Sequence, residues 1–237
     1  MELLTPSACA ACGMPGPCLC AACEQALPRV GAIGCVRCGH PWPGPVQACA
    51  ECPPGVARAR QALVYGEPVS RVMHALKDHH RRALAPVLAR ITAQAVDPPA
   101  AGAVLVPVPL SPARLRERGF NQAAVLAQGL GRAWGLPVVH ALARADGAPH
   151  QRGAARRDRL RQVQGAFTVL GAPLHAVLVD DVLTTGATLS AAARALRAAG
   201  CAHVGAVATA RVVHGATPAR VGSRRSTSGG GARWSST

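Results

Sequence analysis

The sequence contains few aromatic residues, few acidic residues and a single lysine. Aromatic residues make up 3% of its 237 positions, which argues against base stacking as the main source of affinity for a single-stranded nucleic acid. Lys77 is the only lysine, so arginine carries almost all of the formal net charge of +15. Such a charge favours an anionic partner, which could be a phosphorylated metabolite, a nucleic acid or an acidic surface. A compositional bias toward arginine and alanine is the alternative explanation.

Long apolar runs are also absent. No segment approaches the length of a membrane-spanning helix, and the stretch MELLTPSACAACG lacks the basic flank and the apolar centre of a signal peptide. We therefore expect a cytoplasmic protein without a membrane-spanning segment. Hydrophobic residues make up 49% of the sequence, and the chain length fits one large domain or one domain with a small module.

The cysteines are concentrated at one end of the chain, where nine of the ten lie between Cys9 and Cys52. Eight of them form four CxxC pairs, which are Cys9 and Cys12, Cys20 and Cys23, Cys35 and Cys38, and Cys49 and Cys52. Two CxxC turns complete a tetrahedral four-sulfur site, so the pairs predict one or two structural Zn²⁺ ions. A reducing cytosol and the regular recurrence of the pairs disfavour disulfides and redox motifs. The spacing leaves open how the pairs combine, and Cys18 is an alternative ligand.

The composition divides the chain into three parts. Residues 1–60 predict a small cysteine-rich module, too small to fold without metal. Residues 61–213 alternate helical and strand-like segments, which indicates an α/β domain with a mainly parallel sheet covered by helices. Within this domain, the arginine-dense residues 141–169 predict a mobile surface loop that returns to the core. Residues 214–237 are rich in glycine, serine and arginine, and we expect them to be disordered.

Hydrophobic periodicity locates the main elements of the α/β domain. It predicts one or two amphipathic helices over residues 70–96 and short buried strands at 104–108, 177–179 and 203–209.

Two adjacent carboxylates, Asp180 and Asp181, follow the strand predicted at residues 177–179. The carboxyl end of such a strand faces the crevice where open α/β sheets bind ligands, so we expect two ionised acceptors in a solvent-filled cleft. Carboxylates accept hydrogen bonds from the vicinal hydroxyls of a sugar. A strand, turn and helix with accidental acids is the alternative interpretation.

The turn that follows the acid pair has the features of a phosphate site. Its residues are Thr184, Thr185, Gly186, Ala187 and Thr188. They place backbone N–H groups and three hydroxyls at the start of a predicted helix, and a glycine lets the backbone approach an anion closely. Hydroxyl acceptors beside a phosphate site together suggest a ribose 5-phosphate.

These residues resemble a known family. The stretch VLVDDVLTTGATL resembles the phosphoribosyl pyrophosphate (PRPP) motif of type I phosphoribosyltransferases. With the segments HALKDHHRRALA, VPVPLSPARLRERGFNQA and HQRGAARRDRLRQVQGAF and the four CxxC pairs, the chain resembles the ComF (competence protein F) family, which includes GntX-like proteins. The resemblance runs from about Cys9 to Ala210. It implies a Rossmann-like parallel sheet of the type I phosphoribosyltransferase kind, preceded by a double zinc-ribbon module.

The resemblance also implies roles for individual residues. Asp180 and Asp181 would hold the ribose hydroxyls, and Thr184 to Thr188 the 5-phosphate. The loop at Val106–Pro109, with Pro107 and Val108, occupies the place that contacts pyrophosphate, and Mg²⁺ would accompany PRPP. The candidate charge-neutralising groups are Lys77, Arg118, Arg156, Arg157 and Arg159, of which Arg118 joins the aspartates as a catalytic candidate. Residues 151–161 would close over the site. Asp78, His80, Ala148 and Gln162 depart from the family pattern.

Two main functions follow from this reading. One is transfer of a phosphoribosyl group from PRPP to an acceptor that the sequence does not identify. The other is a non-catalytic protein that binds PRPP or handles single-stranded DNA during DNA uptake, through phosphate contacts or through competence-machinery partners. As a variant of the second, the cysteine-rich module would be a docking platform for another protein.

Overall fold

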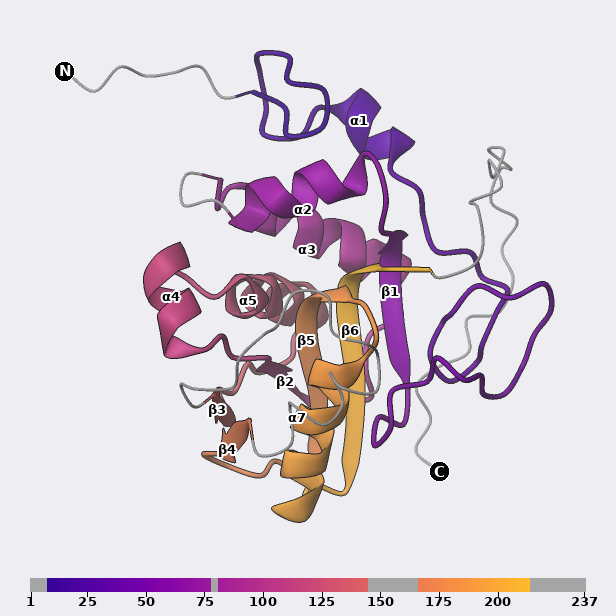
Figure 1. Cartoon of the computed structure of the whole chain (residues 1–237), viewed down its shortest axis with the longest axis vertical. Coiled ribbons are helices and arrows are strands. Elements are labelled where there is room, and N and C mark those ends of the chain that lie inside the picture. The colour runs from indigo at the N-terminus through magenta and orange to yellow at the C-terminus, as the bar shows by residue number, and fades with distance from the viewer. Residues whose placement is uncertain (1–7, 78–80, 145–165, 214–237) are drawn as a thin grey trace.

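The computed structural model describes residues 8–77, 81–144 and 166–213 (Figure 1). Several predictions concern residues outside these ranges, namely the roles of Arg156, Arg157 and Arg159, the closing loop at residues 151–161, the family departures at Asp78, His80, Ala148 and Gln162, and the disordered tail at residues 214–237. The division into residues 1–60 and 61–213 also stays a prediction.

The central sheet has four parallel strands in the order β1-β6-β5-β2. They are β1 (Ala59–Val64), β2 (Val104–Pro107), β5 (His175–Leu183) and β6 (His203–Arg211). A separate antiparallel pair is formed by β3 (Leu142–Arg144) and β4 (Phe167–Val169). The predicted α/β class with a mainly parallel sheet is therefore confirmed. Val- and Leu-rich strands suit this arrangement, because both faces of a parallel sheet are buried.

Helices cover both faces of the sheet. On one face lie α2 (Val69–Lys77), α3 (Leu84–Ala95) and α5 (Gln122–Trp134), whose buried side chains pack with Val177 and Val179 of β5. On the other face α7 (Ala187–Ala198) packs with Leu178, and it lies in front of β5 in Figure 1. Val177, Leu178 and Val179 thus point alternately to the two faces of the sheet, as successive side chains of a β-strand do. Two short helices, α1 (Ala21–Ala26) and α4 (Pro112–Arg118), complete the described elements.

The cysteine-rich segment packs against both layers of the molecule. Its first part, drawn in indigo beside α1 in Figure 1, contributes Cys9 and Leu19 to the core of α2 and α3. Its second part forms the loop beside β1 and contributes Cys35 and Cys38 to the core of α7. The two halves of this segment therefore support opposite faces of the sheet.

The predicted elements need one correction that bears on the site. The strand expected at residues 177–179 runs from His175 to Leu183, so the acid pair lies inside it and not at its end. The physical reason is that β6 continues to pair with β5 as far as Arg211. Its other neighbour, β2, ends at Pro107 opposite Val179. The acid pair still lies beyond the end of β2, so β5 is not paired with β2 at Asp180 and Asp181.

The helices predicted over residues 70–96 are two, α2 and α3, and the strand predicted at 104–108 is β2. In the part of the chain that the structure describes, no helix is both long enough and apolar enough to cross a bilayer.

Candidate functional site

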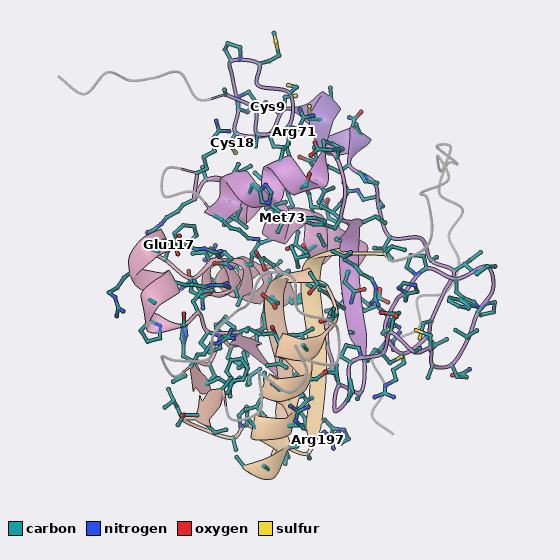
Figure 2. All side chains as sticks on the ribbon, in the orientation of Figure 1. Cys9, Cys18, Arg71, Met73, Glu117 and Arg197 are labelled. Carbon is teal, nitrogen blue, oxygen red and sulfur yellow. The ribbon has the colours of Figure 1, made fainter. Side chains whose placement is uncertain are left out.

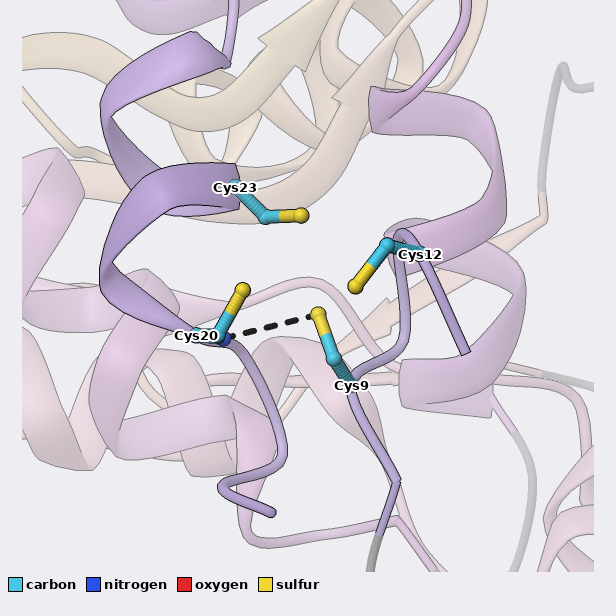
Figure 3. A group of neighbouring side chains, drawn as sticks. All are labelled: Cys9, Cys12, Cys20 and Cys23. Atoms are coloured by element: carbon cyan, nitrogen blue, oxygen red, sulfur yellow. Dashed lines mark hydrogen bonds between the residues drawn. The ribbon is translucent and has the colours of Figure 1, made fainter. Parts of the chain in front are cut away.

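The first cysteine cluster consists of Cys9, Cys12, Cys20 and Cys23 (Figure 3). Their sulfur atoms all lie within 4.8 Å of one another, and the backbone N–H of Cys20 donates a hydrogen bond to the sulfur of Cys9 at 3.4 Å. Burial alone would raise the pKa of the Cys9 thiol, but hydrogen bonds from backbone groups, those of Cys12 and Cys20 foremost, lower it to about 6. Cys9 is therefore favoured as a thiolate, which is the form that binds metal, whereas hydrogen bonds with the side chains of Cys20 and Cys12 raise the pKa of the Cys23 thiol to about 12.

The second cysteine cluster consists of Cys35, Cys38, Cys49 and Cys52. Sulfur atoms are 3.5 Å apart in the contacts between Cys35 and Cys52 and between Cys38 and Cys49. A Zn–S bond of about 2.3 Å places the sulfurs of a tetrahedral site roughly 3.8 Å apart. The two clusters thus have donor atoms and spacings that could hold a zinc ion each.

The structure answers two questions that the spacing left open. CxxC pairs that are neighbours in the sequence combine, the first with the second and the third with the fourth. Cys18 belongs to neither cluster, and its sulfur instead contacts the backbone oxygen of Ala83 at 3.6 Å. All cysteines of the described ranges are free thiols, so the disulfide alternative has no support there.

The carboxyl group of Asp181 is held by residues from two helices. It accepts from the Lys77 ammonium of α2 at 3.2 Å and from the Gln122 amide of α5 at 3.5 Å. A third contact is local, from the backbone N–H of Val182 at 2.8 Å. Asp181 is only 6% exposed, so the expectation that it faces a solvent-filled cleft is wrong. The carboxylate is instead a buried, positively compensated acceptor.

The Asp180 carboxyl lies next to that of Asp181 and is affected by its charge. Burial in the first place, and then the negative charge of Asp181, raise the pKa of the Asp180 carboxyl well above its usual range. The backbone N–H of Asp181 donates a hydrogen bond to Oδ1 of Asp180 at 2.9 Å. Two carboxyls this close cannot both ionise freely. The nearby charge of Lys77 acts in the opposite direction and lowers the pKa of Asp180. A diol or a cation at this position would favour ionisation of Asp180.

The segment RGFNQ, residues 118–122, contacts both the acid pair and the loop after β2. Gly119 ends α4 with a φ of +70°, a conformation that favours glycine. The side chain of Asn121 caps α5 through the backbone N–H of Ala123 and donates to the backbone oxygen of Val108 at 3.0 Å. Gln122 then reaches Asp181. Two successive side chains thus hold the loop after β2 and the acid pair in fixed relation.

The other predicted residues near β2 and α4 are placed as follows. Pro107 and Val108 are buried, and the backbone N–H of Val108 donates to Val179 at 2.9 Å, which brings the predicted pyrophosphate loop beside β5. Arg118, half-buried at the end of α4, is not linked to the acid pair by any hydrogen bond or ion pair of the described residues. The structure therefore brings Lys77 to the acid pair but not Arg118.

The turn from Thr184 to Thr188, here named the phosphate turn, leaves the strand at once. β5 ends at Leu183, and α7 begins at Ala187 after Gly186, whose φ is +74°. The Thr185 hydroxyl accepts from the backbone N–H of Ala187 at 3.4 Å. Thr184 is exposed, and Thr185 and Thr188 are half-buried. The turn thus combines the backbone N–H groups of a helix start with accessible hydroxyls, which is the arrangement that binds phosphate.

Sequence reasoning did not single out two groups at the site. Gln122 was noted only as part of RGFNQ, although it contacts Asp181 and its own Oε1 is buried without a hydrogen-bond partner in the described structure. Arg144, at the end of β3, lies over the ring of Phe167 at 5.4 Å, and the charges of Asp180 and Arg114 both act on it. Arg144 opens the arginine-dense segment, and that position was the available signal.

A parallel sheet in which an acid-bearing strand leads through a threonine–glycine turn into a helix defines a phosphoribosyltransferase-type α/β protein. Residues 119–227 match the phosphoribosyl transferase domain. The chain is 36% identical to the DNA utilization protein YhgH of Salmonella typhi over 165 residues, which are 64% of this chain and 71% of that protein. The chain therefore belongs to the ComF family of phosphoribosyltransferase-like proteins.

Two competence proteins are similar over shorter stretches. Competence protein F of Haemophilus influenzae is 37% identical over 102 residues, 40% of this chain and 44% of that protein. Competence protein ComFC of Bacillus subtilis is 39% identical over 94 residues, 39% of this chain and 38% of that protein.

Proposed function

We propose that the protein binds PRPP together with Mg²⁺ and transfers its phosphoribosyl group to an acceptor. The observation that carries the proposal is the continuity of the acid pair and the phosphate turn: Asp180 and Asp181 are separated from Thr184 by two residues of β5. A sugar held at the carboxyls would thus have its 5-phosphate at the start of α7. The match of residues 119–227 to the phosphoribosyl transferase domain supports the same ligand class.

The chemistry would be a substitution at C1 of the ribose. The bond between C1 and pyrophosphate breaks, pyrophosphate leaves with the electron pair, and the acceptor supplies the pair for the new bond. Mg²⁺ is suited to a site with one or two carboxylates and substrate phosphates, and it would neutralise charge on the leaving group. The chain would add Arg144 and the backbone after β2, at Pro107 and Val108, on the pyrophosphate side.

In this proposal Lys77 orients Asp181 and does not contact pyrophosphate directly. Its ammonium contacts Asp181 at 3.2 Å, and the side chain of Lys77 is 27% exposed. Together with Gln122 it fixes the orientation of one carboxyl of the pair. Asp181 then remains a well-ordered acceptor for a ribose hydroxyl, while Asp180 gains its charge as the ligand arrives.

Calorimetric titration tests the proposal. The protein is titrated with PRPP and Mg²⁺, and separately with ribose 5-phosphate and with pyrophosphate. Asp180→Asn and Asp181→Asn should each weaken PRPP binding by about tenfold or more, because a hydrogen bond to a charged acceptor contributes about 1.5–3 kcal/mol. Asp97→Asn, an exposed aspartate beyond α3, is the matched control. Absence of PRPP binding by the parent protein would refute the proposal, and pyrophosphate release with a metabolite pool would report transfer.

We propose further that each cysteine cluster binds one structural Zn²⁺. The four sulfurs of a cluster leave no position open for a substrate, which is the pattern of a structural site. Metal analysis should give two zinc ions per chain, and Cys20→Ser or Cys49→Ser should each reduce that value by about one. A parent protein purified with no zinc, and unchanged in stability by a chelator, would contradict this assignment.

A second candidate function is binding of single-stranded DNA through its phosphates. The net charge of +15 favours it, and the relatives named above include a DNA utilization protein and competence proteins. DNA affinity should then fall steeply between low and moderate salt. If Asp180→Asn abolishes PRPP binding and leaves DNA binding unchanged, the two ligands occupy separate sites.

A further inference from the structure

The segment that carries the second cysteine cluster contacts the phosphate turn at Pro53. Pro53 directly follows the cluster residue Cys52 and is buried. A Cβ added to Gly186 would lie 2.9 Å from Cγ and 3.0 Å from Cβ of Pro53. The proline ring therefore lies directly against the backbone of Gly186, at the residue where the turn enters α7.

The residues after Pro53 are fixed to the same helix and to its neighbouring strand. The backbone oxygen of Gly55 accepts from the Arg197 guanidinium of α7 at 3.1 Å. The backbone N–H of Ala57 donates to Val204 of β6 at 2.8 Å. Pro53 is thus held between the cysteine cluster on one side and attachments to α7 and β6 on the other.

A second connection runs from the same cluster to the strand end before the turn. The buried guanidinium of Arg211 donates to the backbone oxygen of Cys38 at 2.9 Å and to His40 at 3.1 Å. The backbone of Arg211 pairs with Leu183, the last residue of β5. Leu183 is therefore connected to the second cluster through Arg211, which contacts Cys38. Gly186 is connected to it through Pro53, which follows Cys52.

The first cysteine cluster lacks such connections in the described structure and gives an internal control. Its loop is attached to the region of α2, where Arg71 donates to Ala11 at 3.2 Å and Arg81 to Ala8 at 3.1 Å. Figure 2 shows Cys9 and Cys18 near Arg71, well away from Arg197 of α7.

From these contacts we infer that a metal ion in the second cluster positions the phosphate turn, and that Pro53 is the positioning residue that transmits its presence. This inference rests on the proposed function, because it assigns the 5-phosphate to the turn. Without the ion, the four thiols have no common centre and the loop of Cys49 and Cys52 loses its anchor. Pro53 then no longer limits the positions of Gly186, so the N–H groups of the turn lose their common orientation.

Two pairs of variants test the inference. Pro53→Ala keeps all eight cysteines and removes the ring from Gly186, and Pro54→Ala changes an exposed proline next to it. Cys49→Ser and Cys20→Ser remove a half-buried cysteine from the second and the first cluster. Zinc content is measured for each protein, followed by the affinities for ribose 5-phosphate and for pyrophosphate alone.

Pro53→Ala should retain its zinc and bind ribose 5-phosphate about tenfold more weakly, because small displacements of positioning groups have effects of that size or larger. Pyrophosphate affinity should be unchanged, since that subsite lies at the end of β2. Cys49→Ser should lose about one zinc ion and show the same two affinity changes. Pro54→Ala and Cys20→Ser should bind both ligands as the parent does. Equal weakening by both proline variants, or by both cysteine variants, would overturn the inference.

Amide hydrogen exchange separates this inference from the proposed function. Exchange at Thr184 to Thr188 should be faster in Pro53→Ala than in Pro54→Ala without any ligand present. If the parent protein binds no ribose 5-phosphate but this difference is observed, the proposed function fails and the mechanical link stands. Equal exchange in the two variants overturns the link, whatever the parent protein binds.

Discussion

Replacement of Arg211 by methionine tests whether the second cysteine cluster carries the charge of a metal-bound tetrathiolate. Arg211 is 1% exposed, and its acceptors are the backbone oxygen of Cys38, the Nδ1 atom of His40 and the Oε1 atom of Gln61. None of these acceptors is a carboxylate. A buried cation without an anionic partner costs several kcal/mol, so we expect thiolates of the second cluster to supply the compensating charge. Burial raises the pKa of the Cys38 thiol, and the charge of Arg211 acts in the opposite direction.

The expected magnitude follows from the charge of the site. Four thiolates around Zn²⁺ carry a net charge of −2, which a buried guanidinium offsets. Loss of an outer hydrogen-bonding partner typically weakens metal binding by about 10–100-fold, or roughly 1.4–2.7 kcal/mol. Without metal the sign reverses, because exchange of a buried charge for an apolar side chain of similar size is neutral or stabilising. The substitution should therefore destabilise only the zinc-loaded protein.

The assay is competition with a chelator on the zinc-loaded protein, with zinc release followed as a function of chelator concentration. In Arg211→Met, about half of the zinc should leave at a chelator concentration about 10–100-fold lower, and the other half should leave as in the parent. Arg71→Met is the matched control, since Arg71 donates to the backbone of Ala11 in the first cluster but is exposed. Equal shifts of both halves, or no shift, would refute the electrostatic argument.

Three further outcomes are expected. Asp180→Asn should be more stable than the parent near neutral pH and equal to it below about pH 4. The reason is that the pKa of the Asp180 carboxyl is raised in the folded protein, so the parent protein loses stability as the pH rises from the unfolded toward the folded pKa of this group. Urea unfolding at both pH values checks this. Gly129→Ala should lower the unfolding free energy by about 1–2 kcal/mol despite the better helix propensity of alanine, because the new Cβ would lie 2.4 Å from Cβ of Ala89; an unchanged melting temperature would contradict the close packing of α3 on α5. Gln122→Leu should weaken PRPP binding while the unfolding free energy changes by less than about 1 kcal/mol, because the amide leaves one buried atom unpaired; a large loss of stability would instead make Gln122 a structural residue.

Local sequence patterns predicted the cysteine sites and the buried strands of the sheet. The CxxC pairs predicted four-sulfur sites for one or two zinc ions because a two-residue spacing brings two sulfurs together whatever surrounds them. The short apolar run at β2 predicted a buried strand for an equally local reason. How the four pairs combine was different, since all four have the same spacing and only the folded chain determines which pairs meet.

The environment of the acid pair could not be predicted in the same way. Lys77 and Gln122 meet Asp181 from α2 and α5, two helices remote from it in the sequence. The length of β5 depends on β6, which pairs with it beyond the end of β2. The strand was therefore predicted too short, and the acid pair was predicted as exposed. Tertiary packing determined both properties.

The same packing explains why a cysteine-rich segment accompanies this sheet. Metal binding would stabilise a segment that has little core of its own. The two clusters would pass that stabilisation to opposite layers, since Cys9 packs with α2 and α3 whereas Cys35 and Cys38 pack with α7. The acid pair lies on β5, which, like the other strands of the central sheet, contributes side chains to both layers. One layer supplies Lys77 to Asp181, and the other carries the phosphate turn into α7. Of the two cluster-bearing segments, only the second contacts the turn itself in the described structure, through Pro53.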